Sequence, residues 1–299
     1  METILVSGLT KLYGRERGVS ELCFSVGEGE VFGYLGPNGA GKTTTIRLLL
    51  DLIRPTSGAV ELFGRDLSKG AVELKRRIGY IPGDLRLYEQ LTGRQLLAYF
   101  ARLRALDLRG ADDRLAQRLD LDLDRPIHTL SRGNRQKIGL IQAFAHRPEL
   151  LVLDEPTSGL DPLMQQEFNA LVREAAADGR TVFLSSHVLS EVQQMADRVA
   201  LLREGELVLL DTVEGLRARA TARMEVTFAA EPAADAFTRV PGVRELDRRG
   251  PTVSFALEGS ADPLVKAIAN HEVLAIDSHE ADLEDVFLAL YRREPGDAG

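Results

Sequence analysis

Residues 31–44 read VFGYLGPNGAGKTT, and this stretch decides how the rest of the chain is interpreted. An apolar run typical of a buried strand ends at Gly36, and residues 45–50 form a second apolar run typical of a helix. Between them lies the pattern G-x-x-x-x-G-K-T, in the strand–loop–helix order that a phosphate-binding loop requires. Its glycines allow successive N–H groups to converge on one anion, and the following helix adds its unpaired first-turn donors. The stretch therefore predicts a nucleotide-binding loop.

Two side chains of this loop have a predicted chemical role. Lys42 would bridge the β- and γ-phosphates of a nucleoside triphosphate, and the Thr43 hydroxyl would coordinate Mg²⁺. A glycine-rich turn with an incidental lysine is the alternative, and the match of eight positions in the right context disfavours it. The residues expected to bind nucleotide here are Gly36, Pro37, Asn38, Gly39, Ala40, Gly41, Lys42, Thr43 and Thr44.

Composition limits the classes of protein to consider. A chain of 299 residues, 44% hydrophobic and 27% charged, is long enough for one large and one small globular domain. No apolar run approaches the roughly 18 residues of a membrane span, and the N-terminus lacks the basic start of a signal peptide. Any membrane role is therefore expected to come through a partner. The net charge of −8 argues against nucleic acid as a ligand. The single cysteine, Cys23, is expected to be buried between Leu22 and Phe24.

The first 215 residues alternate strand-like and helix-like runs around a helical segment at about residues 85–148. Strands are expected at residues 3–9, 22–26 and 59–63 before this segment, and at 150–153, 181–185 and 198–210 after it. Thr92 with Gln95 forms a capping box, and Ser131 begins a helix that runs to Phe144. Asp161 is expected to cap a helix over residues 162–179. The order predicts an α/β domain with a helical insertion.

The remaining residues, 216–299, differ in character from the first 215. Strands are expected at 224–228, 243–247, 252–257 and 273–278, with helices at 233–239, 262–269 and 283–291. This order predicts a small α+β domain of the βαββαβ kind. The apolar residues of the last helix could belong to a core or to a docking face, and their helical spacing favours a core.

Two carboxylates and a histidine follow buried strands in the first domain. Residues 151–155 read LVLDE, so Asp154 and Glu155 stand together at the end of an apolar strand. An ATPase needs one carboxylate for Mg²⁺, the role expected of Asp154, and another for the attacking water, the role expected of Glu155. His187 lies just past another apolar strand, after Ser185 and Ser186, and could reach the γ-phosphate region, although a lone histidine there is more often a structural hydrogen-bonding residue.

With these motifs in order, the first 215 residues resemble the ATP-binding cassette ATPases, the energy-coupling subunits of membrane transporters. The resemblance implies a P-loop NTPase cassette with a mixed sheet, and it extends to six motifs. They are Tyr13 for the adenine-stacking aromatic residue, Gly36 to Thr43 for the phosphate loop, LSRGN at 130–134 for the signature loop, Asp154 and Glu155, SGLD at 158–161 for the dimer-seam loop, and His187 for the switch histidine.

The resemblance also implies the partners. In the family, the signature loop contacts the γ-phosphate held by the opposite protomer, which assigns that role to Ser131, Gly133 and Asn134 and places Asp161 at the seam. It implies a dimer that binds two ATP with Mg²⁺, a homodimer or a heterodimer, at the cytoplasmic face of the cell membrane. Its partner would be a separately encoded transmembrane permease that exports drugs, antibiotics, lipids or polysaccharides. The alternative function is a soluble cassette ATPase that acts on nucleic acid or the ribosome.

The chain departs from the family pattern at two places. Arg132 and Asn134 replace the usual glycine and glutamine of the signature loop. Gly83 stands where most members have a glutamine that reaches the metal. Two interpretations of the neighbouring Asp84 stay open: it orients a water that fills the vacated Mg²⁺ position, or it caps a turn before Leu85.

Overall fold

The computed structural model describes residues 1–14, 16–69, 71–108, 110–219, 222–257 and 260–279. The chain divides into two compact units, one from Met1 to Val213 and one from Glu214 onward.

The centre of the first unit is a six-stranded sheet in the order β10-β9-β3-β8-β7-β6, parallel except for the edge strand β10. All residues of β3, β7 and β8 are buried, because helices or a second sheet cover both faces. The strands are β3 (Val31–Leu35), β6 (Ile78–Ile81), β7 (Leu150–Asp154), β8 (Thr181–Ser186), β9 (Arg198–Arg203) and β10 (Glu206–Thr212).

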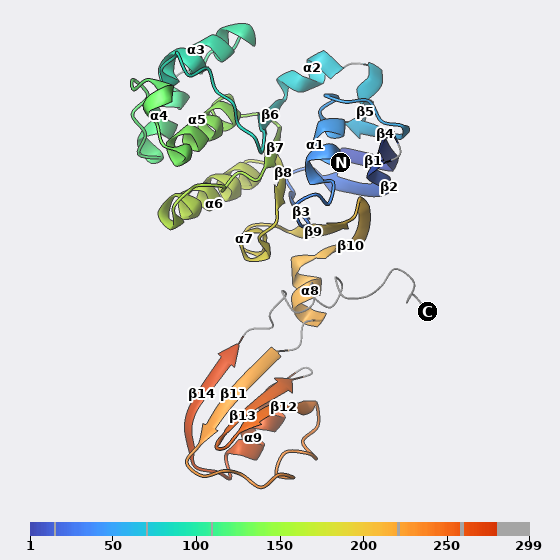
Figure 1. Cartoon of the computed structure of the whole chain (residues 1–299), viewed down its shortest axis with the longest axis vertical. Coiled ribbons are helices and arrows are strands. Elements are labelled where there is room, and N and C mark those ends of the chain that lie inside the picture. The colour runs from blue at the N-terminus through green and yellow to red at the C-terminus, as the bar shows by residue number, and fades with distance from the viewer. Residues whose placement is uncertain (15, 70, 109, 220–221, 258–259, 280–299) are drawn as a thin grey trace. The chain divides into compact units, whose positions relative to one another are not determined.

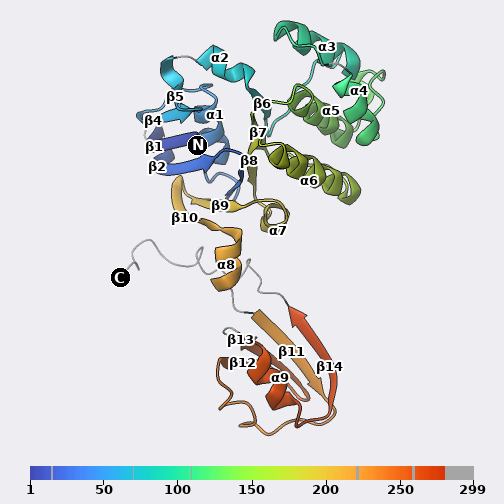
Figure 2. The ribbon, with the colours of Figure 1, turned by 180° about the vertical axis from the view of Figure 1, so that it is seen from behind.

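A second, antiparallel sheet has the order β2-β1-β4-β5 and lies, with helix α1 (Lys42–Leu49), on one side of the central sheet, as Figures 1 and 2 show. Aromatic rings join the two sheets: Phe24 of β2 stacks on Phe32 of β3 at 5.6 Å, and Phe32 stacks on Phe183 of β8 at 5.7 Å. The strands are β1 (Glu2–Tyr13), β2 (Glu16–Gly27), β4 (Ser57–Leu62) and β5 (Arg65–Asp66).

Helices cover the other side of the central sheet (Figure 1). The predicted helical insertion is confirmed, with α3 (Gly93–Leu103), α4 (Ala111–Arg118) and α5 (Arg132–Phe144), and Thr92 caps α3 in the expected capping box. Helix α6 (Pro162–Ala177) begins at the Asp161 cap, as predicted. The short helices are α2 (Ala71–Arg76) and α7 (Leu189–Gln193), with 3₁₀ turns at Leu67–Lys69 and Ile127–Thr129. The predicted α/β cassette with a mixed sheet is therefore confirmed.

The second unit contains an antiparallel sheet in the order β12-β13-β11-β14 and helix α9 (Asp262–Ile268). Helix α8 (Val213–Arg219) spans the division between the units. Around the sheet, Phe237 packs against Phe228 at 5.6 Å and Phe255 at 5.0 Å. The strands are β11 (Ala222–Phe228), β12 (Val243–Arg249), β13 (Thr252–Leu257) and β14 (Val273–His279).

Two predictions about local structure are wrong. Residues 233–239 form turns rather than a helix, because Ala236 and Val240 donate to the carbonyls three residues earlier, Ala233 and Phe237. Cys23 is exposed, since β2 alternates and points Leu22 and Phe24 inward but the cysteine outward. The helix predicted at residues 283–291 lies outside the described residues.

Candidate functional site

A cleft of about 330 Å³ opens over the phosphate loop, between β3 and α1. Most residues predicted to bind nucleotide line it, whereas Gly36 and Ala40 of the same loop are buried and do not. The prediction omitted Arg17 and Gly18 of β2, which form part of the wall. The lining residues are Tyr13, Arg17, Gly18, Pro37, Asn38, Gly39, Gly41, Lys42, Thr43, Thr44 and Glu155.

The backbone of the loop requires glycine at two positions. Gly39 and Gly41 have φ angles of 83° and 107°, in the region that residues with a Cβ rarely adopt. A β-carbon on Gly41 would also stand 2.7 Å from the carbonyl oxygen of Gly18. Gly41 is the N-cap of α1, so the first-turn N–H groups of the helix start at the cleft. Backbone donors and a helix N-terminus at one place favour an anion.

Lys42 holds a buried ammonium at the centre of this loop. Its Nζ donates to the carbonyl oxygens of Gly36 at 2.6 Å and Pro37 at 3.2 Å, and lies 3.3 Å from Glu155 Oε1. The side chain is 7% exposed, so these oxygens take the place of most of its water. A positive charge fixed there attracts the phosphates of a nucleotide.

Asp154 and Thr43 come together at the end of β7, although 111 residues separate them in the chain. Thr43 Oγ1 donates to Asp154 Oδ2 at 2.9 Å, and Ser185 Oγ of β8 donates to Asp154 Oδ1 at 2.5 Å. Asp154 is fully buried, and its charge contributes, after burial, to raising the pKa of Tyr80 to about 12. A carboxylate and a hydroxyl side by side are oxygen ligands of the kind that Mg²⁺ prefers.

Glu155 and His187 form the next contact, at 2.8 Å between Glu155 Oε2 and His187 Nδ1. Glu155 has a φ of 49°, a conformation that costs a residue with a side chain about 1–2 kcal/mol. The bond from its N–H to the Ser185 carbonyl, at 3.2 Å, supports that conformation. Glu155 Oε1 is buried and has no hydrogen-bond partner among the residues that the structure describes, and its contact with Lys42 is an ion pair alone. An orphaned carboxylate oxygen beside a phosphate loop is suited to accept a proton from water.

Tyr13 forms the far wall of the cleft, at the end of β1, and its side chain is about half exposed. Its ring edge approaches Gly18 so closely that a β-carbon there would stand 2.8 Å from Tyr13 Cε2. A flat aromatic face at this place can stack on a base. The neighbouring Arg17 forms an ion pair with Glu206 of β10.

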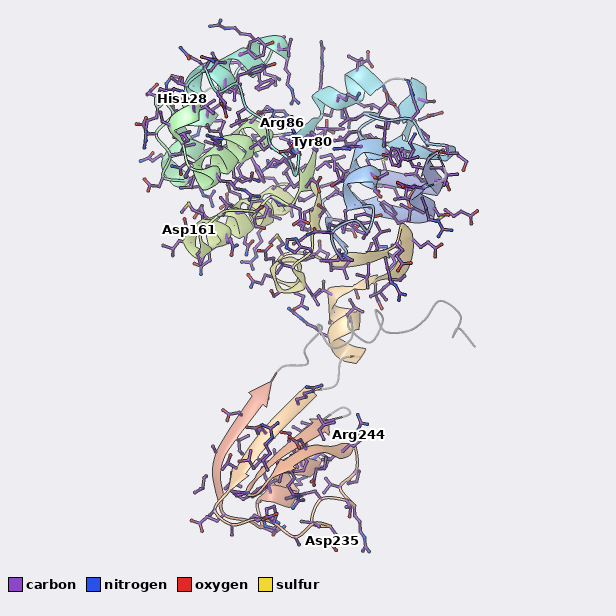
Figure 3. All side chains as sticks on the ribbon, in the orientation of Figure 1. Tyr80, Arg86, His128, Asp161, Asp235 and Arg244 are labelled. Carbon is purple, nitrogen blue, oxygen red and sulfur yellow. The ribbon has the colours of Figure 1, made fainter. Side chains whose placement is uncertain are left out.

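The signature and seam loops meet each other rather than the cleft of this chain. Arg132 Nη2 donates to Ser158 Oγ at 2.8 Å, and a β-carbon on Gly133 would stand 2.6 Å from the carbonyl oxygen of Gly159. Ser131 caps α5 by accepting from the N–H of Asn134 at 3.3 Å. The predicted signature residues, Ser131, Gly133 and Asn134, do not line the cleft. Figure 3 shows Asp161, the last residue of the seam loop, at the outer tip of α6.

Gly83 and Asp84 follow β6, on the stretch that carries Arg86 in Figure 3. A β-carbon on Gly83 would stand 3.1 Å from Asp154 Oδ2, so any side chain at this position would begin beside that carboxylate. Asp84 is 76% exposed and accepts from Arg86 Nε at 2.9 Å. The ion pair gives Asp84 a local partner in addition to the two roles considered from the sequence.

These features define a P-loop nucleotide-binding protein of the α/β class. A family model described as ABC transporter matches residues 19–158. The bacitracin transport ATP-binding protein BcrA of Bacillus licheniformis is 42% identical over 212 residues, 70% of this chain and 69% of BcrA. A fluoroquinolones export ATP-binding protein of Mycobacterium tuberculosis is 34% identical over 303 residues, covering 98% of this chain and 94% of that protein. A solved ATP-binding subunit of an ABC transporter superposes with a TM-score of 0.67 and 30% identity, over 73% of this chain and 92% of that chain.

The chain belongs to the ABC transporter family. It is an ATP-binding subunit, an ATPase that works with a separate transmembrane component, and subunits of this kind dimerise. Among the helices that the structure describes, we find none long and apolar enough to cross a membrane.

Proposed function

We propose that the cleft binds ATP together with Mg²⁺ and that its side chains divide the chemistry among them. The observation that supports this proposal is the unbroken series of contacts from Thr43 to Asp154, and from Lys42 through Glu155 to His187. Lys42 binds the β- and γ-phosphates, and the faces of Tyr13 and the loop backbone hold the rest of the nucleotide. The residues that would hold Mg²⁺ are Thr43 and Asp154, with Asp84 acting through a water.

Bound Mg²⁺ supplies positive charge to the phosphates. Glu155 orients the attacking water and accepts its proton at Oε1, the oxygen that has no other hydrogen-bond partner. His187 Nδ1 contacts the other oxygen of that carboxylate, so the carboxylate keeps one orientation. Lys42, 3.3 Å from Glu155, would compensate the negative charges of that carboxylate and of the bound phosphates.

The ATP-bound unit is a two-fold dimer, in which Ser131, Gly133 and Asn134 of one copy complete the site of the other. Ser131 and Asn134 lie at the N-terminus of a 13-residue helix, where backbone donors favour an anion. They lie outside the cleft of their own chain, which fits a role toward a second copy. Because one chain carries both the loop and the signature, a homodimer provides two full sites.

The transported molecules are drugs or antibiotics moving outward, because the relatives are named for bacitracin transport and fluoroquinolone export. The protein is peripheral, at the cytoplasmic face of the membrane, where a permease provides the path. Residues 216–299 form an accessory domain of this subunit.

Glu155→Gln tests the division of roles. The variant should bind Mg-ATP as the parent does and lose about 10²–10⁴-fold in kcat, because its amide cannot accept the proton. Equilibrium ATP binding and steady-state phosphate release measure the two properties, with exposed Glu28→Gln as the control variant. A parental rate in Glu155→Gln would refute Glu155 as the general base.

A further inference from the structure

Glu191 of α7 is a carboxylate that the proposed chemistry does not use, and it lies where two loops of the site meet. Its Oε2 accepts from Thr157 Oγ1 at 2.7 Å and from Ser186 Oγ at 3.4 Å. Its Oε1 accepts from Gln165 Nε2 of α6 at 3.3 Å. One partly buried side chain therefore connects three separate segments.

Two of these segments hold the reacting pair. Thr157 is two residues after Glu155, and Ser186 is the residue before His187. The Ser186 hydroxyl also accepts from the N–H of Val188 at 3.0 Å, so His187 lies inside a turn that this hydroxyl closes. Thr157 is buried, with 7% of its surface exposed, and its hydroxyl has Glu191 as its partner. Glu191 thus holds both segments that flank the 2.8 Å contact between Glu155 and His187.

We propose that Glu191 is a positioning residue: it sets the distance between Glu155 and His187 by binding Thr157 and Ser186 through one carboxylate oxygen. The inference rests on the roles proposed for Glu155 and His187. Without Glu191, the Thr157 and Ser186 hydroxyls would lose their shared acceptor. The backbone bond from Glu155 to Ser185 would remain, but the side chain of the exposed His187 would be less restrained. A shift of about 1 Å in such a pair can cost roughly 10²-fold in rate.

Contacts other than those of Glu191 also attach α7 and its C-cap, Gln194, to α6. Asn169 Nδ2 donates to Gln194 Oε1 at 3.0 Å, and Arg173 Nη2 donates to the Gln194 carbonyl at 2.8 Å. Val192 and Met195 are also buried beneath the helix. The polar contacts at Gln194 lie about one turn after Glu191 along α7, so they supply a control in which the same two helices lose a contact.

Three variants of the full chain separate positioning from stability. Glu191→Ala removes the acceptor, and we expect kcat for ATP hydrolysis to fall about 10–100-fold while the Kd for ATP stays parental. Glu191→Gln keeps an oxygen for Thr157 and Ser186, because the Gln165 amide can turn to match it, and should keep at least half of kcat. Asn169→Ala loses the contact with Gln194, which involves neither Thr157 nor Ser186, and should keep the parental kcat.

Thr157 supplies the second measurement. Thr157→Val keeps the shape and loses the hydroxyl, so it should reproduce the loss in Glu191→Ala, whereas Thr157→Ser should restore most of the rate. Because the effect acts through Glu155, adding Glu191→Ala to Glu155→Gln should cause no further loss of kcat.

Each alternative result has one meaning. If Glu191→Ala matches Asn169→Ala, or if its loss multiplies that of Glu155→Gln, Glu191 does not position this pair. If Glu191→Gln is as slow as Glu191→Ala, the charge matters rather than the hydrogen bonds, and positioning is wrong. If Glu155→Gln alone keeps the parental kcat, the proposed function fails, whatever Glu191→Ala does.

Discussion

The nucleotide cleft and the signature loop belong to one chain, yet they differ in how far that chain completes them. In the cleft, Thr43 contacts Asp154, and Lys42 contacts Glu155, all within 3.3 Å. Ser131 is exposed, and its hydroxyl contact is with the N–H of Asn134, in its own helix. The cleft contains opposite charges that hold one another in place, whereas the signature loop presents donors and a helix N-terminus to the outside. This difference supports our proposal that each chain carries one nearly complete site and part of the site of a second copy.

The physical reason lies in the two kinds of scaffold. The cleft is built where parallel strands end at one edge of a sheet, so residues far apart in sequence meet there. The signature loop is the start of a helix in the insertion, and the seam loop that touches it follows β7. In a two-fold dimer, the helix N-terminus of one copy can lie against the cleft of the other copy.

Among the variants that distinguish the cleft from the signature loop, Lys42→Ala should have the largest effect on ATP turnover, because it removes the buried cation of the cleft loop. Loss of a charge that contacts the phosphates in both ground and transition states should lower kcat/KM about 10²–10³-fold and weaken ATP binding. Binding by fluorescence of an ATP analogue and the rate of phosphate release measure both. Unchanged binding would mean that the cleft is not the nucleotide site.

Ser131→Ala should come second, with a loss of about 10–100-fold in ATPase rate and little change in ATP binding to the isolated chain. Thr92→Ala is the matched control, since Thr92 caps a helix of the same insertion through the same kind of bond. Both variants should lose about 0.5–2 kcal/mol of stability, and only Ser131→Ala should lose activity.

Mixing Lys42→Ala chains with Ser131→Ala chains decides whether the signature acts across a dimer. A mixed dimer contains one site with an intact loop and an intact signature, so activity should exceed the sum of the two separate samples. Activity equal to that sum would mean that the phosphate loop and the signature loop of one chain act together, and that the signature does not act across a dimer.

Asp84→Ala should have a smaller effect, confined to the metal dependence of the rate. If Asp84 orients a metal-bound water, the Mg²⁺ concentration at half-maximal rate should rise about 10-fold, near the lower end for such supporting contacts. Gly83→Gln should lower it again, because a side chain there starts 3.1 Å from Asp154. Arg86→Ala is the control, since it removes the other partner of Asp84. A parental Mg²⁺ titration in Asp84→Ala would leave Asp84 as a turn residue.

The smallest effect concerns stability at the far end of α5, which carries the signature at its start. Burial, followed by the Arg104 guanidinium, lowers the pKa of His146 to about 4. Below the unfolded pKa of about 6.5, the unfolded chain binds a proton that the folded chain does not, so stability falls as the pH drops from 6.5 toward 4. After allowance for partial exposure, the loss between pH 7 and pH 5 should be about 1 kcal/mol.

Urea unfolding of the parent and His146→Gln at pH 7 and pH 5 measures this difference. The variant should lose less stability over the interval, because glutamine does not titrate. Equal losses of unfolding free energy in the parent and the variant would show that protonation of His146 does not cause the pH dependence. A loss of ATP binding at the cleft, before the insertion unfolds, would contradict the separation of the two regions.

Much of the cassette could be predicted from short, continuous patterns. The phosphate loop, the apolar strand before Asp154 and the caps at Thr92, Ser131 and Asp161 each lie within a few residues, so local backbone chemistry specifies them. The resemblance to the ATP-binding cassette ATPases then suggested the role of each motif. The prediction of a helix at 233–239 is wrong, because bonds between residues i and i+3 close turns there while Phe237 packs against the ring of Phe228. Local sequence patterns do not specify packing of this kind.

What the sequence alone determined, therefore, is which elements form and which residues carry reactive groups, since strand, loop and helix signals are local. Which groups meet depends on the tertiary structure. The fold paired Asp154 with Ser185, gave Arg132 its partner in Ser158 and placed Glu191 between two loops, all from positions far apart in the chain. Side-chain contacts of this kind depend on where strand ends and helix ends converge, and no spacing along the sequence encodes that distance.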